Sequence, residues 1–329
     1  MKKQCFRAIM LAILVVTAFS GVSSASDAYP DSPIRFIVPF AAGGGSDVFV
    51  RTLAPHLGRE MGVTFVVENM EGAGTQIGLT ALLGAPADGY TVCQANQPHT
   101  AFTIAVQKAS YKASDFAWVN IQQIDPLAFS VMPDKPWRNY VELVDYIKAN
   151  PGEIAIGATQ MSGPHVFLYY LQEEYDLDFI IVPYSGGGEG RAALLGGHVD
   201  AYVGNAFADY SLRDQVRSIA IGWDKRSSLW PDTSTILEVT GDEKLTEVSK
   251  ALASVRGVLV SRKFKENYPE RFEKFVEAYK RAFHSAEHMA DAEKTGQTPI
   301  MLWTGPEEAE KLATSTAESV AAFAHYFSK

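Results

Sequence analysis

The sequence predicts an α/β protein with two doubly wound lobes that face each other across a ligand cleft. Short apolar, β-branched runs alternate with helical patterns along the chain, which is the rhythm of a parallel sheet with helices on both faces. This rhythm restarts after about residue 125, so we expect two lobes. Both parts also contain nearly the same phrase, VPFAAGGGSDVFVR (38–51) and VPYSGGGEGR (182–191).

The first part contains three predicted strands, 34–40, 64–69 and 89–95. The stretch 47–62 follows the first strand and has apolar residues at helical spacing. A glycine-rich turn and the helix-like run IGLTALLGA follow the second strand. The order is therefore βαβαβ, as in half of a doubly wound fold.

The second part begins with a predicted helix, 140–150, which stops at Pro151 and Gly152. Strands and helices then alternate; in order they are EIAIGA, HVFLYYLQEEY, DFIIVPY, GRAALLGG and VDAYVGN. The last third is mostly helical, with helix starts at Pro269 and Pro306. We assign residues 29–125 and about 253–329 to the first lobe and about 126–252 to the second, with the final helices returning to the first lobe.

The N-terminus has the pattern of a secretory signal peptide. Lys2, Lys3 and Arg7 precede the apolar run 8–19, and small residues allow cleavage after Ala25 or Ala28. The apolar run is shorter than the roughly 20 residues of a membrane-spanning helix, which disfavours the alternative of a membrane anchor. We assign residues 1–25 to the signal peptide and expect an exported, periplasmic protein.

Charge and cysteine content exclude some classes of function. Removal of the signal peptide takes the formal net charge from −9 to −12, and such an acidic protein is a poor nucleic-acid binder. Local dipoles must then attract any bound anion. Only Cys93 remains in the exported chain, so we expect no internal disulfide and a buried thiol.

The two glycine phrases lie between a strand and a helix, where parallel α/β sheets bind ligands. Glycine lets the backbone approach a ligand closely, and a helix start offers unpaired N–H groups and a partial positive charge. We predict that these loops bind a carboxylate, with Ser46 as the N-cap of the first helix and Asp47 in its first turn. We expect Arg51 and Arg191 to contribute less than the glycines. The competing interpretation is that both phrases are only tight turns.

A third strand–helix loop, GATQMSGPHVF (157–167), is also a candidate for ligand contact. It contains Thr159, Gln160, Ser162 and the N–H group of Gly163 near a helix start. His165 is either a donor to the ligand or a neutral structural histidine.

These phrases, in their order, resemble a known family. The segments YPDSPIRFIVPFAAGGGSDVFVR, VVEN…GAGTQIG, PADGYT and VPYSGGGEGRAALLGGHVD, with the loop from Ser162 to His165, are similar to the solute-binding proteins of tripartite tricarboxylate transporters, the Bug family. The resemblance extends from about residue 29 to the C-terminus. It implies a fold like that of type II periplasmic binding proteins, a monomer without catalysis, cofactor or metal, and membrane permease subunits as partners.

The resemblance also implies the ligand class and the contacts. The ligand would be a small carboxylate, whether a di- or tricarboxylate or an aromatic or amino-acid carboxylate, in the cleft between the lobes. The implied ligand-binding residues are Ala42, Gly43, Gly44, Gly45, Ser46, Asp47, Asn96, Gln97, Thr159, Gln160, Ser162, Gly163, His165, Tyr184, Ser185, Gly186, Gly187, Gly188 and Asn205. Met70 and Glu71 stand where the family usually has Arg-Pro, and Glu189 replaces a common proline, so the identity of the ligand stays open.

Three alternatives remain at this point. The loop GAGTQIG (72–78) resembles a dinucleotide-binding turn, but the next strand ends without an acidic residue for a ribose. The run HSAEH (284–288) fits one zinc-peptidase pattern, with both histidines on one face of a helix, which would make the protein an exported zinc hydrolase. A periplasmic ligand-sensing subunit would have the same sequence features as a transport protein.

We expect the exported chain to begin at Ser26 or Tyr29 and to be recovered from the periplasmic fraction. N-terminal sequencing of the purified protein checks this. A membrane-bound product that retains Met1 would contradict it.

Overall fold

The structure, a computed structural model, describes residues 29–107 and 109–327. The chain divides into a unit that ends at Asp31 and a unit that begins at Ser32, and the fold below is that of the second unit. The predicted signal peptide lies outside the described residues. In the described part of the chain, no helix is both long and apolar enough to span a bilayer.

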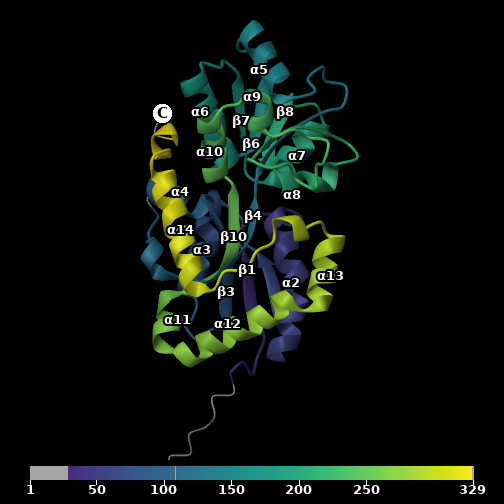
Figure 1. Ribbon diagram of the computed structural model, residues 1–329. Coiled ribbons are helices and arrows are strands. Elements are labelled where there is room, and N and C mark those ends of the chain that lie inside the picture. Colours follow the sequence, from purple (N-terminus) through teal and green to yellow (C-terminus); the bar gives the residue numbers. More distant parts are fainter. Residues whose placement is uncertain (1–28, 108, 328–329) are drawn as a thin grey trace, which may run out of the picture. The chain divides into compact units, whose positions relative to one another are not determined.

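The first lobe is built on a five-stranded mixed sheet in the order β2-β1-β3-β10-β4 (Figure 1). Its strands are β1 (Ile34–Val38), β2 (Phe65–Asn69), β3 (Thr91–Gln97), β4 (Phe116–Asp125) and β10 (Ser254–Ser261). Strand β1 is parallel to β2 and β3, while β10 is antiparallel to β3 and β4. The strand predicted at 34–40 is thus confirmed as a parallel strand, nearly all of it buried.

Helices cover both faces of this sheet. They are α2 (Gly45–Met61), α3 (Gln76–Gly84), α4 (His99–Val106), α11 (Arg262–Asn267), α12 (Pro269–His284), α13 (Ala286–Lys294) and α14 (Pro306–Ala321). Helix α12 packs on α2, and α14 packs on β4, so these C-terminal helices lie with the elements of the first sheet. The helix starts predicted at Pro269 and Pro306 are confirmed. The boundaries assigned to the lobes stay predictions.

The second lobe has its own five-stranded sheet, in the order β7-β6-β8-β5-β9. Its strands are β5 (Leu127–Val131), β6 (Ala155–Thr159), β7 (Ile180–Tyr184), β8 (Ala201–Asn205) and β9 (Arg217–Gly222). Its helices are α5 (Tyr140–Ala149), α6 (Gly163–Tyr175), α7 (Gly187–Leu195), α8 (Ala206–Asp209), α9 (Ile236–Thr240) and α10 (Glu243–Ala251). Strand β6 is parallel to β7 and β8, and β5 is antiparallel to β8 and β9.

The antiparallel strands β5 and β10 were not predicted from the sequence. Each begins where the chain enters a lobe. Strand β4 ends at Asp125, and only Pro126 separates it from β5. The new strand therefore starts at the border between the lobes and runs away from it, whereas β6, β7 and β8 run toward it. Strand β10 enters the first lobe in the same way after α10.

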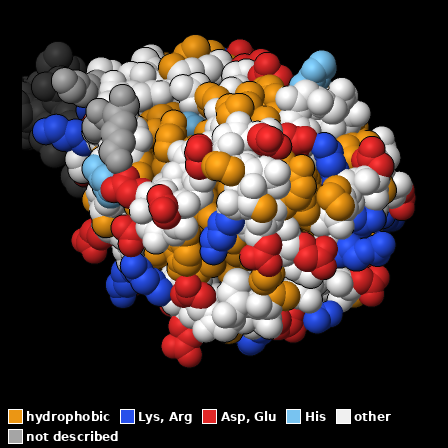
Figure 2. Space-filling view, turned by 90° about the horizontal axis from the view of Figure 1, so that it is seen from above, with side chains coloured by type: hydrophobic (Ala, Val, Ile, Leu, Met, Phe, Trp, Pro, Cys, Tyr) orange, Lys and Arg blue, Asp and Glu red, His pale blue; other side chains and the backbone are white. Residues whose placement is uncertain are grey.

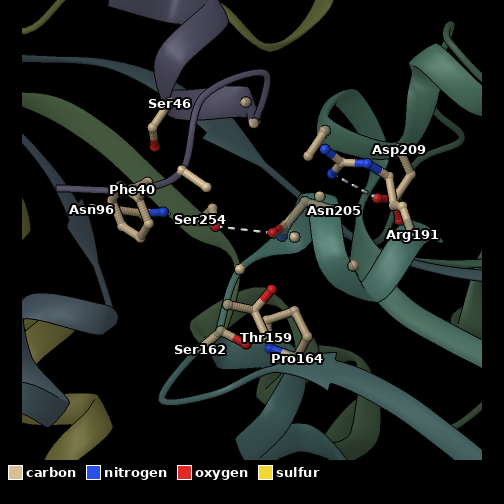
Figure 3. A pocket seen from close by; sticks show the side chains of 18 of the residues that line it. Phe40, Ser46, Asn96, Thr159, Ser162, Pro164, Arg191, Asn205, Asp209 and Ser254 are labelled. Carbon is tan, nitrogen blue, oxygen red and sulfur yellow. Dashed lines mark hydrogen bonds and ion pairs between the residues drawn. The ribbon is translucent and has the colours of Figure 1, made fainter. Parts of the chain in front are cut away.

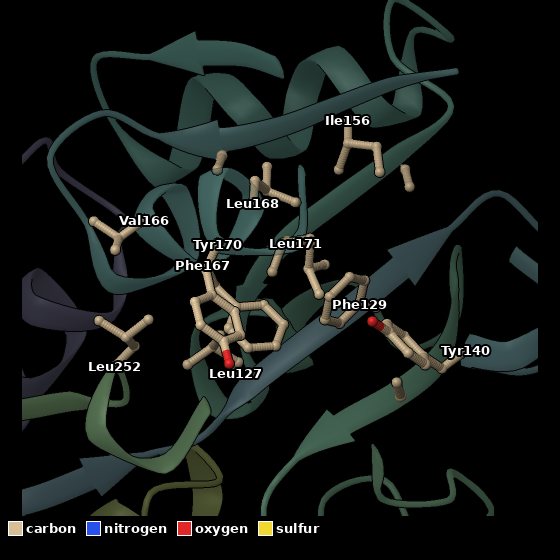
Figure 4. Packing of buried hydrophobic residues seen from close by; sticks show 14 of the residues in the cluster. Leu127, Phe129, Tyr140, Ile156, Val166, Phe167, Leu168, Tyr170, Leu171 and Leu252 are labelled. Atoms are coloured by element: carbon tan, nitrogen blue, oxygen red, sulfur yellow. The ribbon is translucent and has the colours of Figure 1, made fainter. Parts of the chain in front are cut away.

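The core of the second lobe is rich in aromatic side chains (Figure 4). The ring of Phe129 on β5 lies 5.5 Å from that of Tyr140 and 6.0 Å from that of Phe167, in edge-to-face geometry. Such pairs add to the free energy gained from burying the rings. Phe129 thereby joins β5 to α5 and α6.

The surface carries charges of both signs. On the face shown in Figure 2, acidic and basic side chains are interspersed with apolar and polar ones. Lys and Arg are not gathered there into the basic stripe that nucleic-acid-binding proteins use.

We expect Phe129→Ala to lower the free energy of unfolding by about 3–5 kcal/mol, because it leaves a cavity between β5, α5 and α6. The exposed Val66 on the edge strand β2 provides a control: Val66→Ala is expected to change it by less than about 1 kcal/mol. Chemical denaturation followed by circular dichroism measures both variants. Equal effects of the two substitutions would contradict the role given to Phe129.

Candidate ligand-binding site

A cavity of about 70 Å³ lies between the two sheets and is lined by residues from both lobes (Figure 3). It is bordered by the loops that follow β1, β6, β7 and β8 and by the start of β10. The lining residues are Phe40, Ala41, Gly44, Gly45, Ser46, Asn96, His99, Thr159, Ser162, Pro164, Gly186, Gly187, Gly188, Arg191, Tyr202, Gly204, Asn205, Ala208, Asp209, Ser254 and Arg256. The parallel strands of both lobes thus end at one shared site, as expected for α/β sheets.

The first glycine loop joins β1 to α2. The N-cap of α2 is Gly44; Ser46, predicted as the N-cap, is instead the second residue of the helix. The Asp47 carboxylate accepts hydrogen bonds from the Gly43 N–H at 2.9 Å and from the side chains of Arg51 and Asn69. Burial raises the pKa of Asp47, but these three hydrogen bonds lower it overall. Asp47 therefore holds the loop and does not line the cavity.

The second glycine loop, between β7 and α7, is built in the same way. Its N-cap is Gly186, and the Glu189 carboxylate, three residues later, accepts hydrogen bonds from Ser185 N–H at 3.1 Å and from its hydroxyl at 2.6 Å. In both loops an acidic residue thus folds back to the residue before the N-cap. The repeated phrase in the sequence corresponds to a repeated structure.

These loops direct the starts of α2 and α7 into the cavity. The first N–H groups of a helix have no partner within the helix, and Gly45, Ser46, Gly187 and Gly188 line the cavity at these two starts. Positive φ occurs in these loops only at Gly43, where it is 75°. At Gly187 the constraint is space, because a Cβ atom there would lie 3.1 Å from the Arg191 Nη1, whereas a Cβ atom on Gly188 would have no neighbour within 4 Å.

The third loop contributes Thr159 and Ser162 to the lining. The Ser162 hydroxyl caps α6 by accepting the His165 N–H at 3.2 Å, and Thr159 shares a 3.1 Å hydrogen bond with the Tyr202 hydroxyl. His165 itself faces away from the cavity, with its ring 5.3 Å from that of Phe327. Burial lowers the pKa of His165 to about 4. Of the two alternatives, this position favours the neutral structural histidine over the ligand donor.

Two buried arginines also line the cavity. Arg191 follows the start of α7 by only one turn, and helical side chains lean toward the N-terminus, so its guanidinium reaches Gly187. The prediction that Arg191 contributes less than the glycines therefore lacks a geometric basis. Arg51 is half exposed and points to Asp47 and Asn69. Arg256 on β10 is 3% exposed, and its Nη1 donates to Asp125 at 2.9 Å.

A chain of buried hydrogen bonds joins the lobes beneath the cavity. Asn96 donates to the Ser254 hydroxyl at 3.3 Å, which donates to the Asn205 side chain at 3.0 Å. Asn205 in turn donates to the Asp125 carbonyl at 3.0 Å. The Asp125 carboxylate accepts the N–H groups of Phe207 and Ala208 as well as Arg256. The floor of the site is thus continuous across both lobes.

Several polar atoms of the lining have no hydrogen-bond partner among the described residues. They are the Asn96 Oδ1, both ring nitrogens of His99, both carboxylate oxygens of Asp209 and the Arg256 Nε. Buried polar groups in folded proteins are nearly always paired. Their concentration around one cavity indicates that a polar ligand supplies the missing partners.

Burial shifts the pKa of two of these groups. It lowers the pKa of His99 to about 3, with smaller contributions from Arg256 and His165, so the imidazole is neutral. It raises the pKa of Asp209 to about 7, which Arg191 opposes and Asp125 reinforces. The Arg191 Nη1 lies 3.6 Å from the Asp209 carboxylate, close enough for an ion pair and too far for a hydrogen bond.

The structure brings together about half of the residues predicted for the site. Gly44, Gly45, Ser46, Asn96, Thr159, Ser162, Gly186, Gly187, Gly188 and Asn205 line the cavity. Ala42, Gly43, Asp47, Gln97, Gln160, Gly163, His165, Tyr184 and Ser185 lie outside its lining. Most of the second group shape the loops: Gln97, for example, accepts the Ala101 N–H, and the Gly163 backbone packs against the Leu252 carbonyl.

Sequence reasoning missed His99, Tyr202, Asp209 and Arg256, and it gave Arg191 only a minor contribution. The signal for Arg256 was a single arginine inside the apolar run ALASVRGVLVS, because a charge on a buried strand requires a partner or a function. Asp209 had no comparable signal, since no long apolar run surrounds it.

The zinc-site alternative does not match the geometry. Helix α12 ends at His284 and α13 begins at Ala286, with Ser285 as its N-cap, so the predicted single helix face is wrong. The Nδ1 atoms of His284 and His288 lie 2.8 Å from carbonyls of their own segment. Among the described residues, no three His, Cys, Asp or Glu side chains form a group able to hold a metal ion. The GAGTQIG loop lies outside the cavity lining.

We expect His99 to make stability depend on pH. Because its pKa is lower in the folded state, only the unfolded chain takes up this proton below about pH 6.5, so the free energy of unfolding falls as the pH falls. Between about pH 6.5 and 4.5, the free energy of unfolding of wild type should fall by about 2 kcal/mol more than that of His99→Gln. Denaturation at several pH values tests this, with the exposed His198→Gln as control. Parallel pH curves for wild type and His99→Gln would contradict it.

Comparisons with known proteins agree with this fold. The family model described as the tripartite tricarboxylate transporter family receptor matches residues 49–258. Protein BugT of Bordetella pertussis is 31% identical over 236 residues, which cover 70% of this chain and 72% of BugT.

Solved structures show the same fold. The periplasmic binding protein BugD superposes with a TM-score of 0.77 at 24% identity, covering 91% of this chain and 98% of BugD. Rpa4515 of R. palustris with adipate superposes with a TM-score of 0.80 at 22% identity, covering 91% of this chain and 98% of Rpa4515. MatC of Rhodopseudomonas palustris with bound malate superposes with a TM-score of 0.77 at 21% identity, covering 91% of this chain and 100% of MatC. From the match to the family model and the identity with BugT, this chain belongs to the tripartite tricarboxylate transporter receptor family, the family that includes the Bug proteins.

Proposed function

We propose that this protein captures a small carboxylate in the cavity between its lobes and delivers it to the membrane subunits of a tripartite tricarboxylate-type transporter. The observation that carries the proposal is the convergence of two helix starts and two buried arginines on one small cavity. Each element favours an anion, and together they come from both lobes.

The helix starts supply the anion-binding groups. A carboxylate at the starts of α2 and α7 would accept hydrogen bonds from N–H groups at the positive ends of two helix dipoles. Such charge-assisted hydrogen bonds contribute about 1.5–3 kcal/mol each. The site can thus attract an anion although the chain as a whole is acidic.

The arginines add positive charge in unequal measure. Asp125 lies 2.9 Å from Arg256 and offsets much of its charge. Arg191 has only the longer, 3.6 Å contact with Asp209. Its Nη2 also donates to the Gly43 carbonyl at 3.5 Å, which links the two glycine loops across the cavity. We infer that Arg191 contacts the bound carboxylate from the second lobe.

The comparison structures support a carboxylate ligand. Two proteins of the same fold were solved with adipate and with malate, both dicarboxylates. We propose di- or hydroxycarboxylates of this length as first candidates.

The remaining parts of the proposal follow from the family. The protein would be an exported monomer without a catalytic step, metal or cofactor. Residues 29–125 and about 253–329 would form one lobe and about 126–252 the other. The relatives' description as receptors and as a periplasmic binding protein supports a binding function in that compartment.

We expect at least one of succinate, malate or adipate to raise the melting temperature of the purified protein, because a ligand that binds only the folded state stabilises it. Arg191→Ala and Gly187→Val should each weaken binding of that compound by about tenfold to a thousandfold, through loss of one or two charge-assisted hydrogen bonds. Isothermal titration measures the affinities.

Arg281→Ala serves as the control, because Arg281 is an exposed arginine paired with Glu60 on the surface. Its affinity should match that of wild type. Failure of a broad panel of small carboxylates to stabilise the protein would overturn the proposed function.

A further inference from the structure

We propose that Asp209 accepts a hydrogen bond from a donor group on the ligand, so that the preferred ligands are amino- or hydroxycarboxylates. This inference rests on the proposed function and specifies the substrate class of the same site. It starts from the Asp209 side chain, which has no role in the binding of an unsubstituted carboxylate ligand.

Asp209 is the last residue of α8 and lines the cavity. It is 1% exposed, and neither of its oxygens has a hydrogen-bond partner among the described residues. Gly204 provides the space for it, since a Cβ atom there would lie 2.3 Å from the Asp209 Oδ2. A buried carboxylate without donors is strongly destabilising, so its retention at a cavity wall points to a partner that arrives in the cavity.

Most donors around Asp209 are engaged elsewhere, and the remaining one, Arg191 Nη1, lies beyond hydrogen-bond distance. The Nη2 of Arg191 donates to the Gly43 carbonyl, and its Nη1 is 3.6 Å from Asp209. The Tyr202 hydroxyl shares its hydrogen bond with Thr159. The N–H groups of Phe207 and Ala208, at the start of the same short helix, donate to Asp125. The described residues therefore leave both oxygens of Asp209, which lines the cavity, without a hydrogen-bond donor.

The site offers different chemistry at its two sides. In Figure 3, Arg191 and Asp209 lie together on one side, and Phe40 and Asn96 lie on the other. A ligand carboxylate near Arg191 and the start of α7 would place its neighbouring substituent next to Asp209. An ammonium or hydroxyl group there donates to the Asp209 carboxylate, whereas a second carboxylate would be repelled by it.

A matched series of ligands tests this inference. Succinate, malate and aspartate share one carbon skeleton and differ only in a hydrogen, a hydroxyl or an ammonium group; glutarate, 2-hydroxyglutarate and glutamate form a second series. The titrations are carried out at about pH 8, where Asp209, with a pKa of about 7, is ionised. In at least one series the hydroxy or amino member should bind wild type at least tenfold more tightly than the unsubstituted member. Whichever of the hydroxy and amino members binds more tightly identifies the donor group of the ligand.

Substitution of Asp209 provides the second measurement. Asp209→Asn removes the charge and keeps the shape, so it should reduce the tenfold preference to less than about threefold. Asp214→Asn makes the same change at a highly exposed position and should retain the wild-type preference. Thermal unfolding checks that both variants fold. The titrations of wild type test the inference even if a variant does not fold.

The outcomes separate this inference from the proposed function. If unsubstituted carboxylates bind wild type as tightly as their amino and hydroxy counterparts, the role of Asp209 is overturned and carboxylate capture stands. A preference that persists unchanged in Asp209→Asn also overturns it. If no compound of either series binds and a broader carboxylate panel also fails, both proposals are overturned.

Discussion

The carboxylate of Asp125 is the point on which the two-lobed arrangement depends. It lies at the end of β4, one residue before β5 begins the second sheet. It pairs with Arg256 on β10, the strand on which the chain has returned to the first lobe, and it accepts the N–H groups of Phe207 and Ala208 in α8 of the second lobe. One fully buried group therefore ties both chain crossings to the cavity floor. Removing one member of such a buried pair typically costs about 3–5 kcal/mol, because it leaves the other charge unpaired.

Around this floor, the two glycine loops give the site an approximate internal repeat. Each loop folds an acidic residue back onto its own backbone, Asp47 in the first lobe and Glu189 in the second. Both acids lie outside the cavity lining and accept backbone N–H groups of their own loops. The first N–H groups of α2 and α7 therefore remain at the cavity. The repeat extends to the arginines, since a glycine in each loop, Gly45 and Gly187, gives space to the guanidinium of Arg256 and Arg191. Binding groups for an anion are thus built from both lobes without a net positive surface.

The buried charges of the site are unevenly balanced, and this imbalance decides what the cavity can recognise. Arg256 and Asp125 are closely paired at 2.9 Å, so this pair acts mainly as structure, although the Arg256 Nε has no partner among the described residues. Arg191 and Asp209 are 3.6 Å apart and only weakly paired, which leaves a donor and an acceptor side by side at the cavity wall. The neutral imidazole of His99 and the Asn96 oxygen add further unpaired atoms. A ligand with both an anionic group and a donor would complete this set, whereas an apolar ligand would leave every one of these atoms unpaired.

The sequence by itself determined the features that depend on neighbouring residues. Alternating strand and helix patterns predicted the α/β lobes, and the phrases at 38–51 and 182–191 predicted both glycine loops, because helix starts, turns and glycine conformations are local properties. The resemblance in motif order predicted the family. Only the tertiary structure decided which residues meet in the cavity. Arg256 arrives on a strand about 130 residues after Asp125, and the orientation of His165 toward Phe327 follows from packing of the C-terminal turn. Such pairings depend on how the chain crosses between the lobes, and no short window of sequence contains that information.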